Sequence, residues 1–308
     1  MKQITNNILM IRPEHFGFNE ETAANNSFQT NDQSLSPKQI EEKAKEEFDA
    51  FVNELKRHNV HVIVMKDTDS PIKPDALFPN NWVSFHEDGS LVCYPMFSET
   101  RRKERRHEDL LALLGEEYKI SRDYTFEHYE EEDMFLEGTG SMILDRVNNI
   151  VYANLSARTD LRLLDKWCIL MNYKKVVFFA KDRNGEDIYH TNVMMALGTD
   201  FCVICLDSIT NENERIEVEQ SLQDTGKEII KISYDQMEQF AGNMLQVGRE
   251  NGSHYLVMSK TAHDALTEDQ LRKISAHTSI IVGNIPTIEK YGGGSVRCMM
   301  AEMFLPLN

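Results

Sequence analysis

The spacing of apolar and polar residues predicts that helices and strands alternate along this chain. Apolar side chains recur at helical spacing over residues 36–58, which indicates one long amphipathic helix. Ser36 and Gln39 are placed to form a capping box at its start, and Pro37 suits the first helical turn. The apolar stretch 60–64 that follows alternates as a strand does.

Shorter patterns of both kinds continue to the C-terminus. Further strands are expected at residues 91–94, 141–144, 150–152, 176–179, 201–206, 229–232, 255–258 and 279–282. Further helices are expected at residues 104–114, 159–171, 212–223 and 267–276. The order strand, strand, helix, strand recurs about every 60 residues, and no linker rich in proline or glycine divides the chain. We therefore expect one α/β domain over residues 1–308, built from several similar modules.

The net charge of the chain excludes some classes of binding partner. The 308 residues include 33 basic and 50 acidic side chains, which gives a net charge of −17. Nucleic acids and anionic membranes bind basic surfaces, so neither is expected as a partner. No apolar stretch approaches the ~20 residues of a membrane-spanning helix. The first residues lack the apolar core of a signal peptide, and we expect a cytoplasmic protein.

The five cysteines are scattered and odd in number, so no disulfide framework is expected. Cys202 and Cys205 have the spacing of a metal or redox pair, but strand alternation would place them on opposite faces. Cys298 follows three glycines at 292–294, which allow a ligand to approach the backbone closely. This stretch alone supports two interpretations of Cys298 equally: a nucleophile, or a buried small apolar residue.

Two further residues stand where scaffolds often present functional groups. His190 lies where a loop meets an apolar segment, and Glu137 lies between an apolar pair and a glycine turn. A histidine can activate a thiol and a carboxylate can orient the histidine, although each residue could also be structural. The basic run 101–106 is expected to start a helix, where its charge opposes the helix dipole. That conflict suggests a functional role for one of its arginines.

Taken together, these segments resemble the guanidine-modifying (pentein) superfamily, which includes arginine deiminases, dimethylarginine dimethylaminohydrolases and amidinotransferases. The resemblance covers nearly the whole chain and is carried by residues 75–81, 101–104, 136–138, 156–159, 190–192 and 292–298. It implies an α/β pentein fold, a five-bladed β/α propeller with pseudo-five-fold symmetry. Five loops support that repeat at intervals of 62, 53, 53 and 55 residues, and they carry Asp75, Glu137, His190, Asn243 and Cys298.

The resemblance also implies the roles of individual residues. Cys298 would attack the substrate carbon, His190 would shuttle protons, and Glu137 would orient His190. Arg101 and Arg158 would bind the substrate carboxylate. The full set of implied substrate-binding positions is Asp75, Asn80, Asn81, Arg101, Arg158 and Asn192. No metal or organic cofactor is implied, because the thiolate is itself the catalyst.

Departures from the family pattern bear on the substrate. Deiminases clamp the guanidinium between carboxylates, whereas this chain has amides at Asn80, Asn81 and Asn192. An amide has an N–H donor, which can bind the carbonyl oxygen of a neutral ureido group. An ionised carboxylate has no such donor. We therefore expect hydrolysis of citrulline to ornithine, carbon dioxide and ammonia. Residues 10–13, 16–17 and 25–29 likewise resemble bacterial citrulline-utilising hydrolases. The segment 137–140 lacks the Gly-Asp ending of the family motif.

Several alternatives remain open at this point. A hydrolase of guanidino compounds, like arginine deiminase or dimethylarginine dimethylaminohydrolase, would use the same nucleophile. An amidinotransferase would require an amine acceptor. A pentein without catalysis would bind a small molecule or another protein. For the enzymes the expected partner is a small amino-acid substrate, and a homo-oligomer is compatible with the sequence.

Overall fold

The computed structural model describes residues 2–23, 26, 28–32, 34–115, 117–249 and 252–308, so residues 25 and 27 of the segment 25–29 lie outside the described residues. Its named strands form five separate three-stranded sheets. In chain order these are β15-β1-β2, β3-β4-β5, β6-β7-β8, β9-β10-β11 and β12-β13-β14. The chain thus builds sheet after sheet from consecutive segments, and one sheet joins its two ends.

The five sheets share one pairing rule. The middle strand pairs antiparallel with the strand before it and parallel with the strand after it, as β4 (Ser90–Cys93) does with β3 (Val83–Phe85) and β5 (Arg122–Thr125). The other strands are β6 (Ile143–Asp145), β7 (Ile150–Asn154), β8 (Lys174–Phe178), β9 (Met195–Leu197), β10 (Phe201–Ile204), β11 (Glu228–Lys231), β12 (Leu245–Gly248), β13 (His254–Ser259), β14 (Ser279–Gly283), β15 (Ala301–Glu302), β1 (Asn7–Arg12) and β2 (His61–Lys66). In the fifth sheet the C-terminal β15 is the antiparallel partner of the N-terminal β1.

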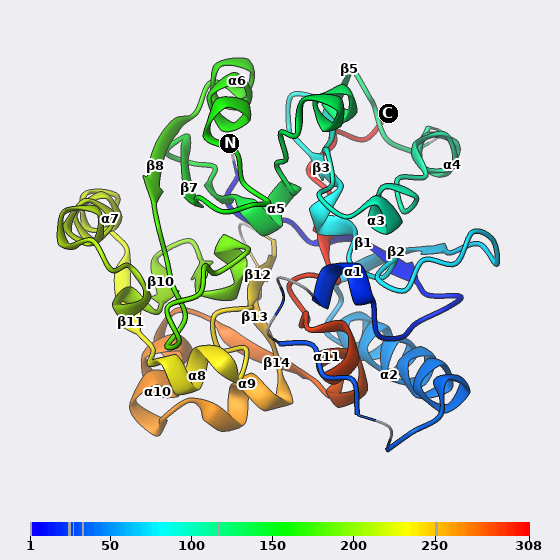
Figure 1. Ribbon diagram of the computed structural model, residues 1–308. Helices are drawn as coiled ribbons and strands as arrows, with labels where there is room; N and C mark the ends of the chain where they lie inside the picture. The colour runs from blue at the N-terminus through cyan, green and yellow to red at the C-terminus, as the bar shows by residue number, and fades with distance from the viewer. Residues whose placement is uncertain (1, 24–25, 27, 33, 116, 250–251) are drawn as a thin grey trace.

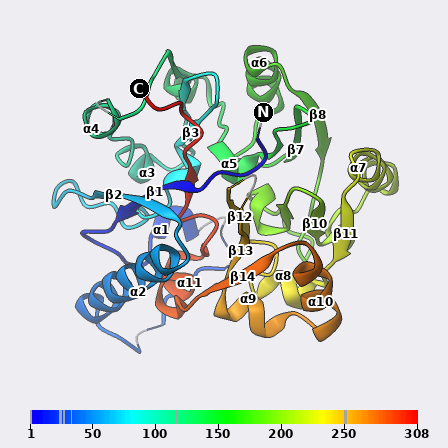
Figure 2. The same cartoon turned by 180° about the vertical axis from the view of Figure 1, so that it is seen from behind.

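Helices connect the parallel strands of each sheet, since a parallel pair requires a long crossover. The connecting helices are α2 (Pro37–Arg57), α4 (His107–Leu114), α6 (Leu161–Met171), α7 (Glu212–Asp224) and α10 (Glu268–His277), and all five lie at the periphery (Figures 1 and 2). The shorter helices are α1 (Glu20–Ala23), α3 (Glu99–Arg102), α5 (Gly138–Ser141), α8 (Tyr234–Glu238), α9 (Lys260–Ala265) and α11 (Pro286–Gly292). Among these, α5 lies near the centre of the molecule (Figure 1).

The long helix α2 has the N-terminal cap and the buried apolar face that its sequence predicts. The Ser36 side chain accepts the Gln39 backbone N–H while the Gln39 side chain accepts the Ser36 N–H, which confirms the capping box. Its buried side chains are Ile40, Ala44, Phe48, Phe51, Val52 and Leu55. They pack in one apolar cluster with residues of β1, β14 and α11.

Every strand and helix expected from the pattern is present, with shifted ends. The structure also contains strands that the pattern did not predict, among them β1, β3, β9 and β12, because short strands buried on both faces show no alternation. The basic run 101–106 does precede the helix α4, of which Arg106 is the N-cap, but its first two arginines belong to a different helix. Arg101 and Arg102 occupy the last turn of α3, where positive charge is favoured by the helix dipole.

None of the described helices is long and apolar enough to cross a membrane.

Replacing Ser36 with alanine is expected to lower the free energy of unfolding by about 1 kcal/mol, because the N-cap hydroxyl is lost. Denaturant titration followed by circular dichroism measures the change. Lys38→Ala is the matched control on the same helix, with an exposed side chain and an expected change below about 0.5 kcal/mol. Equal losses in both variants would contradict a stabilising role for this cap.

Candidate active site

Five loops bring polar side chains to the centre of the molecule. Each loop lies directly before the first strand of a different sheet, and the residues involved are Asp75, Glu137, His190, Asn243 and Cys298. Four of these side chains are at most 2% exposed, and Cys298 is 6% exposed. Asp75, His190 and Cys298 line the same small cavity, which has a volume of about 20 Å³. The repeat in the sequence therefore converges on one site.

Two asparagine amides hold the sulfur of Cys298. Asn192 Nδ2 lies 3.4 Å from Cys298 Sγ and Asn243 Nδ2 lies 3.3 Å from it. The orientation of the Asn243 amide is fixed by the backbone N–H of Arg297, which donates to Asn243 Oδ1 at 3.1 Å. The Nδ2 group of Asn243 must therefore face the sulfur. Both amides supply N–H donors that a thiolate accepts more strongly than a thiol.

Glu137 and His190 form a buried hydrogen-bonded pair. Glu137 Oε2 lies 2.8 Å from His190 Nε2, and both side chains are nearly inaccessible to solvent. Burial lowers the pKa of His190 to about 4, although Glu137 opposes the shift. Arg158 and the histidine outweigh the burial of Glu137 and lower the pKa of its carboxyl to about 2. The resting site thus combines a neutral imidazole with an ionised carboxylate.

His190 and Cys298 lie on the same cavity without a direct hydrogen bond between the two described side chains. The imidazole uses Nε2 to bind Glu137, so Nδ1 is the nitrogen left for chemistry. Gly140 borders that nitrogen, since a Cβ atom on this glycine would stand 2.8 Å from His190 Nδ1. A substrate placed between the thiol and the imidazole would be in reach of both groups.

Arg101 is the most heavily anchored side chain of the site. Its Nε and Nη2 donate to the two oxygens of Glu104 at 3.0 and 2.9 Å. Nη1 donates to Asn81 Oδ1 at 2.8 Å, and Nη2 also reaches the carbonyl of Phe78. Most of its donors therefore have protein partners already. Arg101 lines the cavity, as expected, but its main contact there is with Asn81.

The neighbouring asparagines of the first loop point in different directions. Asn81 lines the cavity, and a Cβ on Gly140 would stand 2.4 Å from its Nδ2 atom. Within the described part of the chain, Asn81 Nδ2 has no hydrogen-bond partner. Asn80 is fully buried but is absent from the cavity wall, and its side-chain atoms have no partner among the described residues. The structure thus separates the two asparagines that the sequence placed together.

Thr22 on α1 and Gln29 after it also line the cavity. Asn19 Nδ2 and Thr22 Oγ1 donate to Asp75 Oδ2 at 2.8 and 3.2 Å, and Arg158 Nη2 donates to the Thr22 carbonyl at 3.3 Å. Further along, Gln29 Nε2 donates to the Gly292 carbonyl at 3.0 Å. Burial raises the pKa of Asp75. Sequence reasoning missed this polar cover, because its contacts join residues far apart in the chain.

Tyr189 is another residue that the sequence analysis did not select. Its hydroxyl donates to the Gly293 carbonyl at 2.9 Å, and the Arg158 guanidinium lies 4.7 Å from its ring centre. In the sequence, only its position next to His190 indicates that Tyr189 belongs to the site. The cavity that these groups enclose has room for about one water molecule, so an amino-acid ligand requires it to widen.

Comparison with known proteins identifies the family of the chain. The sequence profile described as N,N dimethylarginine dimethylhydrolase, eukaryotic, matches residues 12–305. No curated protein sequence matches the chain.

Solved structures share the fold. The N-terminal domain of ArgZ, an arginine dihydrolase from the ornithine-ammonia cycle in cyanobacteria, superposes with a TM-score of 0.75 at 16% identity, over 97% of this chain and 99% of that one. AgrE in complex with ornithine and NAD+ gives 0.72 at 17% identity, over 98% of this chain and 40% of that one. A dimethylarginine dimethylaminohydrolase adduct with S-methyl-L-thiocitrulline gives 0.66 at 15% identity, over 97% and 100%.

The profile match spans nearly the whole chain, and the five three-stranded sheets fit the five blades of pentein structures. The chain therefore belongs to the family described as N,N dimethylarginine dimethylhydrolase, eukaryotic, in the pentein superfamily of guanidino-modifying enzymes, and is a hydrolase of carbon–nitrogen bonds other than peptide bonds.

Proposed function

We propose that this hydrolase acts on the ureido group of citrulline and yields ornithine, carbon dioxide and ammonia, with Cys298 as the nucleophile. The observation that carries the proposal is the orientation of the Asn81 amide. Arg101 is a cation that can only donate, so it fixes Asn81 Oδ1 toward itself. The amide therefore turns Nδ2, a donor without a partner among the described residues, away from Arg101, and we propose that this donor reaches the substrate.

A donor at this point distinguishes two substrate groups. A guanidinium carries only N–H donors around its carbon, and it would meet Asn81 Nδ2 donor against donor. A ureido group places a carbonyl oxygen there, which accepts from Nδ2. Asn192 complements it, because its Nδ2 faces Cys298 Sγ and its Oδ1 has no partner among the described residues. That oxygen suits the terminal NH2 of the ureido group.

The proposed reaction uses the neutral imidazole as a proton carrier. Cys298 attacks the ureido carbon while its thiol proton passes to His190, and the imidazolium then gives that proton to the departing nitrogen. A thiocarbamate remains on the sulfur. Water, deprotonated by His190, cleaves this bond and restores the thiol. The carbamate released loses carbon dioxide, so that citrulline and one water give ornithine, carbon dioxide and ammonia.

The remaining charged groups are proposed to hold the amino-acid end. Asp75 Oδ1 has no hydrogen-bond partner in the described ranges and would accept from the α-ammonium group. Arg158 would bind the substrate carboxylate. Arg101 would add its one N–H that is not already bound to Glu104, Phe78 or Asn81. Glu137 would stabilise the imidazolium that forms on His190.

We also propose that the five sheets close into one five-bladed propeller with pseudo-five-fold symmetry, as a single catalytic domain over residues 1–308. Contacts between the first strands of different sheets support this arrangement, since β15 touches β3 and β9 touches both β6 and β12. A closed ring would explain why loops from all five sheets reach one cavity.

A guanidino hydrolase is the second candidate. Its support is the family profile, which describes dimethylarginine hydrolysis, and the fold shared with an arginine dihydrolase. In its favour, the ionised Glu137 carboxylate is part of the site. Both candidates use the same nucleophile, so the substrate must decide between them.

Incubation of the purified enzyme with citrulline, arginine and dimethylarginine, followed by assay of ornithine, citrulline and ammonia, tests the substrate. Citrulline is expected to give ornithine and ammonia, and Cys298→Ala is expected to abolish turnover because the nucleophile is lost. Cys168→Ala, which removes a buried thiol on α6, is the matched control and should retain activity. Ammonia from arginine but not from citrulline would reject the ureido substrate.

Asn81→Asp is expected to lower kcat/KM for citrulline by about 10- to 100-fold, because the donor to the carbonyl oxygen is replaced by an anion. The new carboxylate can still accept from Arg101, and arginine should gain relative to citrulline. Asn81→Ser and Asn80→Ser form a second pair without added charge. Only the Asn81 variant should lose citrulline turnover, and equal losses in both would contradict the proposed donor.

The dependence of kcat/KM on pH should reflect the low pKa of His190. Because burial keeps the imidazole neutral, the proton acceptor is lost only as the pH falls through about 4, well below the usual 6.5. Initial rates in buffers from neutral to acidic pH measure this limb, and tryptophan fluorescence checks that the protein stays folded. An acid limb centred at or above 6.5 would contradict the assignment.

A further inference from the structure

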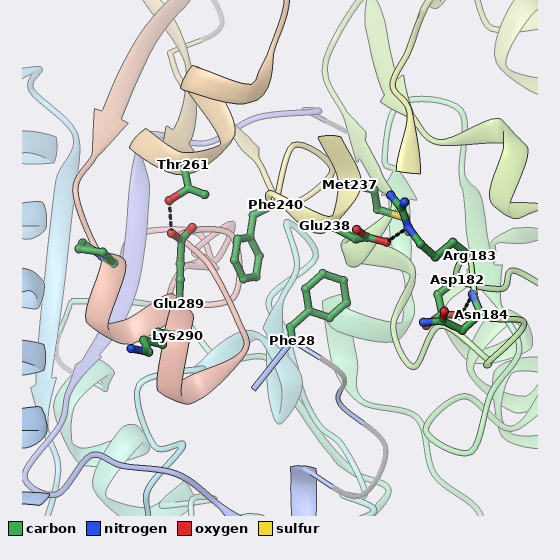
Figure 3. Close-up of a pocket in the computed structure, with 11 residues that line it drawn as sticks. Phe28, Asp182, Arg183, Asn184, Met237, Glu238, Phe240, Thr261, Glu289 and Lys290 are labelled. Atoms are coloured by element: carbon green, nitrogen blue, oxygen red, sulfur yellow. Dashed lines mark hydrogen bonds and ion pairs between the residues drawn. The ribbon is translucent and has the colours of Figure 1, made fainter. Parts of the chain in front are cut away.

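Glu289 is a buried carboxylate that the proposed reaction does not use. The residue lies on α11 and is 3% exposed. Its Oε1 accepts from Ser295 Oγ and its Oε2 accepts from Thr261 Oγ1, both at 2.6 Å. Figure 3 shows the side chain reaching from α11 to Thr261 at the edge of an open groove of about 490 Å³. Burial of a carboxylate is costly, and burial raises the pKa of Glu289.

The Ser295 partner belongs to the turn that carries the candidate nucleophile. The Ser295 carbonyl accepts the backbone N–H of Cys298 at 3.0 Å, so these residues form one hydrogen-bonded turn. Glu289 also holds the start of this turn, since its carbonyl accepts the N–H of Gly293 at 2.9 Å. Gly293 adopts a φ of 61°, in the left-handed region that favours glycine.

The helix that carries Glu289 is itself anchored at its other end. Glu47 on α2 accepts the backbone N–H groups of Thr287 and Ile288 at 2.9–3.0 Å. The first turn of α11 is therefore fixed to a long peripheral helix. Glu289 then connects this fixed helix to the glycine turn through its hydrogen bond with Ser295.

We propose that Glu289 is a positioning residue, which through Ser295 fixes the turn 292–298 so that Cys298 Sγ meets the amides of Asn192 and Asn243 at the cavity. Thr261 and Ser295 bind different oxygens of this carboxylate, and Ser259 also hydrogen-bonds to it. The bond to Thr261 ties Glu289 to α9, whereas the bond to Ser295 ties it to the nucleophile turn. The proposal rests on the nucleophilic role proposed for Cys298.

These two bonds provide a matched pair of variants. Ser295→Ala and Thr261→Ala each remove one hydroxyl that donates to the same carboxylate at the same distance. We expect Ser295→Ala to lower kcat, and the rate of Cys298 alkylation by iodoacetamide, by about 10- to 100-fold, because small misplacements of a reacting atom are costly. KM should change less than about twofold, since binding groups are untouched. Thr261→Ala should stay within about twofold of the wild-type kcat and alkylation rate.

Thermal unfolding of both variants separates positioning from stability, and mass spectrometry assigns the alkylated thiol to Cys298. Glu289→Gln should show an intermediate loss of kcat, because an amide keeps only one acceptor. Equal kcat and alkylation rates in the Ser295 and Thr261 variants would overturn the positioning role. Activity retained in Cys298→Ala would instead reject the proposed function, so the two failures are distinguishable.

Discussion

The buried guanidinium of Arg101 is the constraint on which the organisation of the site depends. A charge removed from water needs charged or strongly polar partners, and Glu104 supplies a two-point contact. The Nη1 group of Arg101 determines the orientation of the Asn81 amide. A guanidinium can only donate hydrogen bonds, so the amide must turn its oxygen toward it. The orientation of the Asn81 amide is thus set by a residue whose own donors are largely bound to other protein groups.

The sheets make this arrangement possible. Each sheet begins with a short strand, and the loop before that strand carries a polar residue to the centre. The crossover helices lie outside, where they cover the sheets with apolar faces such as that of α2 (Figure 1). Pairing of β15 with β1 brings the turn 292–298, near the C-terminus, close to the first strand of the chain. Residues separated by more than two hundred positions, such as Asp75 and Cys298, therefore share one cavity.

The chemistry of the site depends on burial as much as on residue type. A histidine exposed to water would be partly protonated near neutral pH, whereas burial keeps His190 neutral and able to take a proton. Glu137 stays ionised because Arg158 and His190 offset the cost of its burial. Two amides contact Cys298 Sγ, so a neutral imidazole, an ionised carboxylate and a hydrogen-bonded sulfur belong to one site.

The amino-acid sequence by itself determined the long elements and the chemical types at the site. The capping box and apolar stripe of α2 are local properties, and so are the regular spacing of five loops and the identities of Cys298, His190 and Glu137. The short inner strands were not predictable, because strands buried on both faces carry no alternating pattern.

Only the tertiary structure decided how the side chains are used. Asn80 and Asn81 are adjacent in the sequence, yet only Asn81 lines the cavity, and its oxygen faces Arg101, which lies twenty positions away in the sequence. The sequence placed Arg101 at a helix start, but the fold puts it at a helix end, beside Glu104. Asn243 was expected only as one of five evenly spaced loop residues, whereas in the structure it contacts the sulfur of Cys298 directly. These outcomes depend on contacts between distant segments, and no local pattern encodes the direction in which an amide points.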